Sequence, residues 1–237
     1  MSARRFVDMV AAAILLAVLS PLFLVIAIAN RLTSGRALFR QVRVGRDLQP
    51  FVLLKFQTMV DGADAGSSVT VAHDARITPL GRVLRALKLD EVPQLINIIR
   101  GDMSLVGPRP LTPNEIDVVS RHLASVVYRV RPGLTGVASL AFADEERLLA
   151  RAEDPERTYF DEVLPRKIAI ELAYVQRRSW ATDLVIFLLT PLALFLPSVR
   201  KRALIRLVPE CRELLNGPPG KPKTVGDRSA LGARPQS

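Results

Sequence analysis

Two adjacent carboxylates, Asp90 and Glu91, stand just ahead of a predicted helix start. Pro93 is favoured at the first position of that helix, because its missing N–H would be unpaired there in any case. Gly101 then closes the helix after Arg100. The carboxylates therefore lie beside the free amides and the positive end of the helix dipole, a setting that favours ionised carboxylates and bound anions. A carboxylate so placed can act as a nucleophile towards phosphorus or as a ligand for magnesium.

Basic residues on both sides of this pair could offset phosphate charge. Arg85 lies about one and a half turns ahead of Asp90, on the basic face of a helix that we expect to begin at Thr78. Arg109 stands between two prolines in a Gly/Pro-rich turn. Arginine suits phosphate because its planar fork binds two oxygens and stays charged. A basic stripe is more often only a solvated face, and Lys55, on a predicted strand, is open to the same explanation.

Short periodic segments surround these residues. Alternating apolar and polar residues predict strands over 38–45 and 51–56, joined by a turn. A capping box with proline at the first helical position predicts one helix over 112–127. The basic turn 129–136 contains two glycines that would allow close approach of the backbone to a ligand, although Pro-Gly turns are also common in ordinary loops. A further amphipathic helix is expected from about Pro165.

The apolar run 6–29 decides how the chain meets a membrane. It holds about 24 residues, roughly 36 Å as a helix and long enough to cross a bilayer. Ser20 and Pro21 fall past its middle, where proline removes a backbone hydrogen bond. Arginines flank both ends, so both ends are expected in the cytoplasm. We therefore predict a helix broken at Ser20-Pro21 that enters one leaflet and returns. A single crossing is the alternative, and a cleaved signal peptide is disfavoured because another apolar stretch follows Pro21.

The C-terminal third contains a second apolar segment, 184–199, which is short for a span and is interrupted by two prolines. Basic residues and Trp180 flank it, which favours a position in the cytoplasmic interface. We also expect a mobile loop at 61–68. The predicted organisation is a re-entrant membrane helix over 1–36, a catalytic domain over 37–180, interfacial helices over 181–215 and a disordered tail over 216–237.

Composition narrows the class of partner. The chain of 237 residues is 49% hydrophobic and yet carries a net charge of +10, which points to an anionic membrane surface or phosphate-bearing substrates. Nucleic-acid binding is disfavoured, because the basic residues are not interleaved with aromatic ones. The lone cysteine, Cys211, excludes an internal disulfide framework and, with only two histidines, argues against a zinc site. A reducing, cytoplasmic setting follows for the soluble part.

Several ordered motifs together resemble the bacterial sugar transferases, the monotopic polyprenyl-phosphate phosphoglycosyl transferases. The resemblance covers roughly residues 5–190 and is carried by the Ser-Pro pair in the apolar helix and by five further stretches. These are the segments 39–46 (FRQVRVGR), 55–59 (KFQTM), 74–82 (DARITPLGR), 89–110 and 131–136 (RPGLTG). A lone Asp-Glu pair would carry little meaning, but this ordered set is specific.

The resemblance implies transfer of a sugar 1-phosphate from a nucleotide diphosphate sugar, usually a UDP-sugar, to a membrane polyprenyl phosphate such as undecaprenyl phosphate, with release of UMP. It implies that Asp90 is the nucleophile and forms a covalent phosphosugar intermediate, that Glu91 helps to bind Mg²⁺, and that Ser20-Pro21 makes the first helix re-entrant. The fold expected is α/β, mostly helical with a few short strands, on the cytoplasmic face of the bacterial inner membrane. The predicted substrate-binding residues are Lys55, Arg85, Arg109, Arg131 and Thr135.

Two positions depart from the family pattern. Gln57 stands where arginine is more usual, and Val137-Ala138-Ser139 replaces an aromatic-Ala-Gln sequence. Both departures weaken inferences about how the donor is held, and the identity of the sugar cannot be read from these residues. A catalytically silent membrane scaffold with the same fold is the alternative function. The retention of Lys55 and Arg85 with the carboxylate pair argues against it, because charges near a low-dielectric interface are costly unless they are used or paired.

Overall fold

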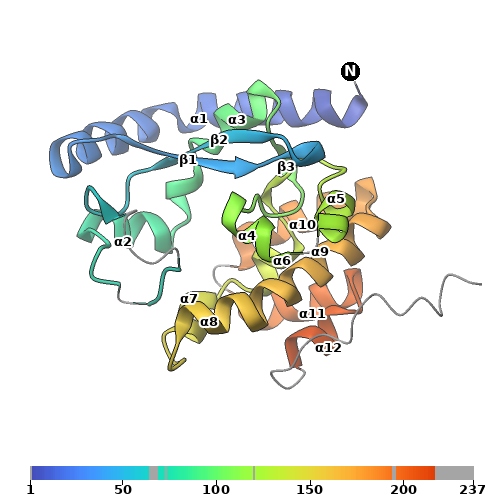
Figure 1. Cartoon of the computed structure of the whole chain (residues 1–237). Helices are drawn as coiled ribbons and strands as arrows, with labels where there is room; N and C mark the ends of the chain where they lie inside the picture. The colour runs from blue at the N-terminus through green and yellow to red at the C-terminus, as the bar shows by residue number, and fades with distance from the viewer. Residues whose placement is uncertain (1, 64–68, 73, 120, 194–195, 217–237) are drawn as a thin grey trace, which may run out of the picture.

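The computed structural model describes residues 2–63, 69–72, 74–119, 121–193 and 196–216. In Figure 1 a long N-terminal helix lies along one side of the molecule, a β-hairpin lies beside it, and the C-terminal helices gather at the opposite side. Helices dominate and the strands are few and short, as predicted. The predicted tail beyond Asn216 and most of the predicted 61–68 loop lie outside the described residues.

The N-terminal helix α1 (Ala3–Ser34) begins after Ser2, whose side chain accepts from the amide of Arg5, and ends at Gly35 in the left-handed conformation. It is helical through Pro21, where the sequence predicts a break, and it shows no interruption at Ser20-Pro21. The reason is local. Proline cannot donate to the carbonyl four residues earlier, which is that of Ala17, but the Ser20 hydroxyl donates to this same carbonyl at 2.8 Å. The hydroxyl thereby replaces the missing bond, and the helix continues.

Most of the α1 surface does not pack on the rest of the chain. The helix is long and apolar enough to cross a membrane, and only 11% of its most apolar window is buried. One side of it packs against α3, β2 and β3, while Ile14, Val18, Leu24 and Val25 are more than half exposed or nearly so on the other side. Such a continuous apolar surface marks a membrane-binding face, which supports membrane association. Whether the helix re-enters or spans stays a prediction.

The β-hairpin confirms the two predicted strands. Strands β1 (Leu38–Val44) and β2 (Pro50–Phe56) pair antiparallel with Leu38 opposite Phe56, and the short helix η1 (Arg46–Leu48) lies in the turn between them. On β2, Leu54 and Phe56 are buried on one face of the strand, and Leu53 is buried on the other. This register also fixes Lys55 on the face opposite to Leu54 and Phe56.

The central segment follows the sequence prediction closely. Helix α2 (Pro79–Ala86) is capped by the Thr78 side chain, and the single-turn helix η3 (Leu89–Glu91) leads into α3 (Gln94–Arg100), which Gly101 closes at φ +106°. A short strand, β3 (Ser104–Val106), follows and pairs in parallel with β4 (Gly133–Thr135). This second sheet holds the Gly/Pro-rich turn of Arg109 against the basic turn 129–136.

The helix predicted over 112–127 is in fact two helices, α4 (Pro113–Val118) and α5 (Arg121–Val127). The predicted capping box between Thr112 and Glu115 is present. The helix nevertheless ends at Val119, which adopts an extended backbone with ψ 140°. Two adjacent β-branched residues, Val118 and Val119, favour this extended conformation over a helix, so the apolar periodicity alone overestimated its length.

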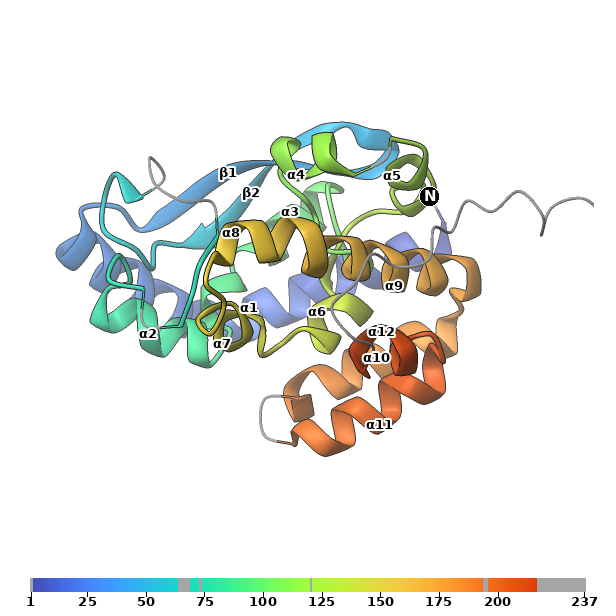
Figure 2. The same cartoon turned by 60° about the horizontal axis from the view of Figure 1, so that its bottom comes forward.

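The remaining chain is helical. It comprises α6 (Val137–Ala141), α7 (Glu145–Leu149), α8 (Pro155–Thr158), the π-helical turn η4 (Tyr159–Val163), α9 (Leu164–Arg177), α10 (Trp180–Ala193), α11 (Pro197–Leu207) and α12 (Cys211–Asn216). Helix α9 confirms the prediction of an amphipathic helix from about Pro165. Figure 2 shows α10, α11 and α12 together at one end of the molecule. The apolar segment predicted over 184–199 belongs to two of these helices, because α10 ends before Pro197 and α11 begins there.

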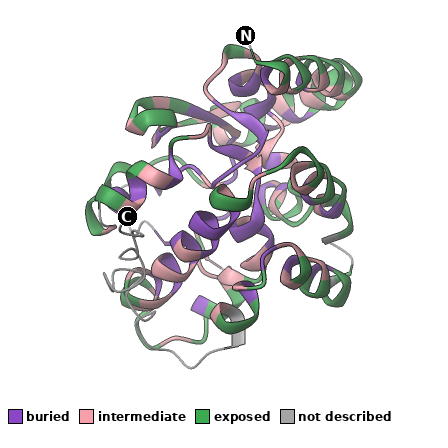
Figure 3. Ribbon diagram, turned by 90° about the vertical axis from the view of Figure 1, so that its right-hand side faces the viewer, coloured by how far each residue is buried: buried purple, intermediate pink, exposed green. Residues whose placement is uncertain are grey.

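The buried core lies between α1, α3, β3 and the C-terminal helices, and Figure 3 shows it as a band of buried residues through the centre. Ile98, Met103, Ile170 and Tyr174 are fully buried in it. Residues of α10, α11 and α12 join the same core. These helices are therefore packed into the body of the protein on one side, while Leu184, Leu188 and other apolar residues of α10 remain exposed on the other.

Candidate active site

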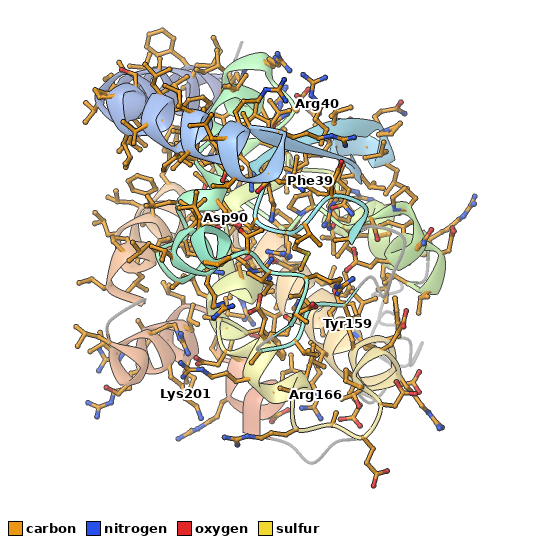
Figure 4. All side chains as sticks on the ribbon, turned by 90° about the vertical axis from the view of Figure 1, so that its left-hand side faces the viewer. Phe39, Arg40, Asp90, Tyr159, Arg166 and Lys201 are labelled. Atoms are coloured by element: carbon orange, nitrogen blue, oxygen red, sulfur yellow. The ribbon has the colours of Figure 1, made fainter. Side chains whose placement is uncertain are left out.

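The carboxylate pair lies in η3, at the junction between two helices. Lys88 has φ +57° and turns the chain sharply after α2, a backbone strain of the kind often found at functional sites. Asp90 is only 6% exposed, and its Oδ1 is buried without a hydrogen-bond partner among the described residues. Figure 4 shows Asp90 below α1, in the interior of the molecule. A buried carboxylate oxygen without a partner is costly, and a cation or an electrophile would satisfy it.

Glu91 has a defined partner where Asp90 does not. Its Oε1 lies 3.6 Å from the Nζ of Lys55 on β2. Burial would raise the pKa of Glu91, but Lys55, Lys88 and Arg109 outweigh burial and lower it. Burial and then the negative charge of Glu91 raise the pKa of Asp90, against the opposing effect of Lys55. The two carboxylates are thus held in different electrostatic states.

Glu91 and Lys55 open onto a small cavity with two arginines. The side chains of Arg43 and Arg109 line it, together with Leu53, Gln94, Pro110, Gly133, Leu134 and Ser139. Burial would lower the pKa of Arg109, but Glu91, Glu145, Tyr159 and Glu115 raise it above its ordinary value, so the guanidinium stays charged. Three cations and one carboxylate around a cavity form a site suited to a phosphate-bearing ligand.

The turn that carries Arg109 is fixed through its backbone. The amide of Arg109 donates to Glu171 Oε1 at 3.3 Å, and its carbonyl accepts from the Tyr128 hydroxyl at 2.6 Å. Glycines permit the close contact of this turn with the basic turn, since a Cβ on Gly133 would come 2.1 Å from the Gly107 nitrogen. The glycines predicted to approach a ligand therefore serve first to bring two backbone segments together.

Sequence reasoning missed the buried network behind the cavity. Arg43 contacts Glu115 Oε2 at 3.4 Å, and the hydroxyl of Tyr159 donates to Glu115 Oε1. Lys167, buried on α9, pairs with Glu145 and lies 5.0 Å from the Tyr159 ring centre. The capping box revealed Glu115 as a helix-start residue, but nothing in the sequence connected it with residues more than forty positions away.

The structure brings some of the predicted site residues together and separates others. Lys55, Glu91 and Arg109 share the cavity, whereas Asp90, which precedes Glu91 in the chain, is not among its lining residues. Arg85 lies in the last turn of α2 and pairs with Glu146, and it is close enough to help to lower the pKa of Asp90.

Two predicted substrate-binding residues have other partners. The Thr135 hydroxyl is bonded to that of Thr190 at 2.8 Å, within the protein. Arg131 donates to the carbonyl of Gly101 at 2.8 Å and lines a different cavity, near the N-terminus of α1. Both residues belong to the predicted motif 131–136, but this segment also contains β4, and their side chains bond to neighbouring parts of the fold. Of the two departures, Ser139 lines the cavity and Gln57 donates to the carbonyl of Met59 at 2.7 Å.

Asp90 and Glu91 could bind magnesium only if a substrate supplied further ligands. Within the described parts of the chain, no group of three or more His, Cys, Asp or Glu residues could hold a metal ion. Magnesium, however, is commonly bound by one or two carboxylates together with substrate phosphates and water. The Asp90-Glu91 pair, with one unpartnered oxygen on Asp90, matches that donor set.

Comparison with known proteins defines the class. The bacterial sugar transferase family profile matches residues 1–197. The chain therefore belongs to the bacterial sugar transferase family, and it is a phosphoglycosyl transferase.

Individual relatives carry more specific names. The UDP-glucose:undecaprenyl-phosphate glucose-1-phosphate transferase of Caulobacter vibrioides is 42% identical over 193 residues, which cover 79% of this chain and 67% of that protein. The exopolysaccharide production protein ExoY of Rhizobium meliloti is 35% identical over 202 residues, covering 78% and 81%. A UDP-N-acetylgalactosamine-undecaprenyl-phosphate N-acetylgalactosaminephosphotransferase of Aeromonas hydrophila is 38% identical over 154 residues, covering 61% and 36%.

Proposed function

We propose that this protein transfers a sugar 1-phosphate from a UDP-sugar to undecaprenyl phosphate, with release of UMP, as a membrane step of exopolysaccharide synthesis. The names of the relatives in Caulobacter and Aeromonas support the donor and acceptor classes, and that of the Rhizobium relative supports the pathway class. The exposed apolar face of α1 supports a membrane-bound acceptor.

Asp90 is the proposed nucleophile, and one observation carries this assignment. Its Oδ1 is buried and has no partner among the described residues, and the next residue, Glu91, lines a cavity with Lys55 and Arg109. In the first displacement this oxygen forms a bond to the phosphorus that bears the sugar, and the bond to the bridging oxygen breaks, so that UMP leaves with the bond's electron pair. In the second, an oxygen of the lipid phosphate attacks the same phosphorus and frees the carboxylate of Asp90. Two displacements allow the soluble donor and the lipid acceptor to bind in turn.

The cations around the cavity have a defined task in this chemistry. An anionic nucleophile and a diphosphate repel each other, so charge on the transferred phosphoryl group and on UMP must be offset. The backbone of Arg109 is held by Glu171 and Tyr128, and its guanidinium remains charged, so we assign it to binding the phosphates of the donor. Lys55 keeps Glu91 ionised. Glu91, with the substrate phosphates, would hold Mg²⁺, which when bound supplies further positive charge to the diphosphate.

The proposed location is the cytoplasmic face of the bacterial inner membrane. Arginines flank the apolar part of α1 at both ends, which supports a helix with both ends in the cytoplasm. The exposed apolar residues of α10, among them Leu184 and Leu188, add a second contact with the bilayer. A UDP-sugar is made in water and a polyprenyl phosphate lies in the leaflet, so a site at this boundary serves both substrates.

The proposed function is tested by UMP release from a panel of UDP-sugars, with detergent-solubilised protein, magnesium and a polyprenyl phosphate, and with Asp90→Asn in parallel. Release that depends on one sugar, on the lipid and on Asp90 supports the proposal and identifies the donor. No release with any donor, from protein shown by circular dichroism to be folded, would favour the silent scaffold or a different nucleotide.

A further inference from the structure

A second cavity lies at the N-terminal end of α1, and six of its ten lining residues are arginines. Its volume is about 220 Å³, and six arginines but only one acidic residue, Asp8, line it. The arginines come from four separate parts of the chain: Arg4 and Arg5, Arg46, Arg129 and Arg131, and Arg178. Asp183 pairs with Arg178 at 3.1 Å and lies 3.9 Å from Arg4, and Asp47 pairs with Arg46 at 3.1 Å. The arginines still outnumber these carboxylates, and such an excess of like charge favours a bound anion.

This cavity is separate from the site of Asp90. The residue Asp90 precedes α3, whereas Arg5 and Arg131 contact the other end of that helix, where they donate to the carbonyls of Ile99 at 2.9 Å and Gly101 at 2.8 Å. Helix α3 has seven residues, so its rise alone places about 10 Å between Asp90 and these arginine contacts. A phosphate in this cavity therefore takes no part in the displacement at Asp90.

The start of α1 adds a further attraction for an anion. The helix has 32 residues and no acidic side chain in its first turn, and both Ser2 and Arg4 line the cavity. Its leading amides and positive dipole end favour a negative charge there. The Nε of Arg4 is buried and has no hydrogen-bond partner among the described residues, and the carboxylate with which it pairs, that of Asp183, lies 3.9 Å away. The cavity thus combines a helix N-terminus, an unsatisfied guanidinium nitrogen and five further arginines.

The surroundings of the cavity point to a membrane lipid as the source of the phosphate. The guanidinium of Arg4 lies 5.3 Å from the centre of the Trp180 ring, which is half exposed. Phe6 and Val7, in the next turn of α1, are also about half exposed. Tryptophan beside apolar and basic residues is the pattern of a membrane interface. The ring and the apolar turn could lie against acyl chains while the arginines hold the headgroup.

We propose that this cavity binds the phosphate of an anionic glycerophospholipid and thereby anchors the start of α1 to the membrane surface. The proposal does not depend on the reaction assigned to Asp90. Arg5, Arg131 and Arg178 also bond to backbone carbonyls, so their replacement would disturb the fold. Arg46 and Arg129 are exposed lining residues whose side chains form no such bond to a backbone carbonyl among the described residues, although Arg46 pairs with its neighbour Asp47. They are the positions to test.

The experiment uses the fluorescence of Trp180, the sole tryptophan, in the detergent-solubilised full chain. Short-chain phosphatidylglycerol, phosphatidylcholine and inorganic phosphate are titrated separately. We expect a saturable change with phosphatidylglycerol and none with phosphatidylcholine. The double variant Arg46→Gln/Arg129→Gln should weaken the apparent affinity for phosphatidylglycerol about tenfold or more, because charge-assisted bonds to phosphate are lost. The matched control, Arg121→Gln/Arg151→Gln, removes the same charge from exposed positions outside the cavity and should leave the affinity unchanged.

Each alternative result has a defined meaning. Equal responses to the two lipids, or equal losses in the two double variants, would overturn the proposal. Saturation by inorganic phosphate at the same concentrations as phosphatidylglycerol would show that the cavity takes free phosphate, and would overturn the lipid assignment. Competition by phosphate only at far higher concentrations would support it. UMP release measured on the same variants keeps this outcome separate from the reaction at Asp90.

Discussion

Glu171 offers a quantitative test of the architecture behind the active site. This carboxyl is 2% exposed on α9, it accepts from the Arg109 amide, and its Oε2 has no partner among the described residues. Burial raises its pKa from 4.5 to about 8, against the opposing effects of the Arg109 and Ala138 amides. Between these two pH values the folded protein therefore holds a proton that the unfolded chain has lost. Stability must fall as the pH rises through this window.

The size of this effect follows from the shift. Each pKa unit corresponds to about 1.4 kcal/mol, and integration between pH 6 and pH 8 gives a loss of about 2 kcal/mol in the free energy of unfolding. Above about pH 9 Glu171 is ionised in both states and the loss levels off. Glu171→Gln keeps an oxygen that accepts from the Arg109 amide but has no proton to lose. The variant should therefore lack this part of the pH dependence.

The assay is reversible urea unfolding in detergent, monitored by circular dichroism at pH 6, 7 and 8, for the native protein and for Glu171→Gln. We expect the stability of Glu171→Gln relative to the native protein to increase by about 2 kcal/mol across this range. A difference that is constant with pH, or that changes in the opposite direction, would refute the assignment of a protonated Glu171 and with it this description of the Arg109 turn.

Three further perturbations test the site and the membrane helix. Lys55→Met removes the partner of Glu91 and should lower UMP release at least tenfold; near-native release would exclude Lys55 from the site. Glu91→Gln removes the like charge that helps to raise the pKa of Asp90, so the acid limb of covalent adduct formation should move to lower pH, and an unmoved limb would contradict this coupling. Pro21→Ala restores a backbone donor in α1 and should favour a spanning helix, measured by labelling the N-terminus from the periplasmic side; an N-terminus that stays cytoplasmic would show that re-entry does not depend on this proline alone.

The sequence was most informative where local chemistry decides local structure. The cap at Thr78, the capping box at Thr112 and the αL closure at Gly101 were all predictable, because each depends on residues within one helical turn. The break after Val118 was not, because the apolar periodicity continues through it while the backbone becomes extended. The continuity of α1 through Ser20-Pro21 was not predictable for a related reason, because it depends on the orientation of one hydroxyl group, which sequence does not specify.

Long-range placement was the harder part of the site. The carboxylate pair and Arg109 were predicted together because chemistry and motif agree on them, and Glu91 and Arg109 do line one cavity. Arg131 was assigned to the same site because it belongs to a motif, but the pairing of β3 with β4 directs it to the second cavity instead. The burial of Glu171 could not be predicted from the sequence. A single glutamate on an amphipathic helix is expected to be solvated, and only the packing of α9 shows that this one is buried.

The central claim, that Asp90 carries the transferred group, is tested most directly by the intact mass of the protein after incubation with magnesium and its UDP-sugar, without acceptor. We expect a gain of one sugar phosphate that maps to Asp90, is absent from Asp90→Asn and disappears when polyprenyl phosphate is added. Transfer to the lipid by protein that never gains this mass, or by Asp90→Asn at an appreciable rate, would contradict it.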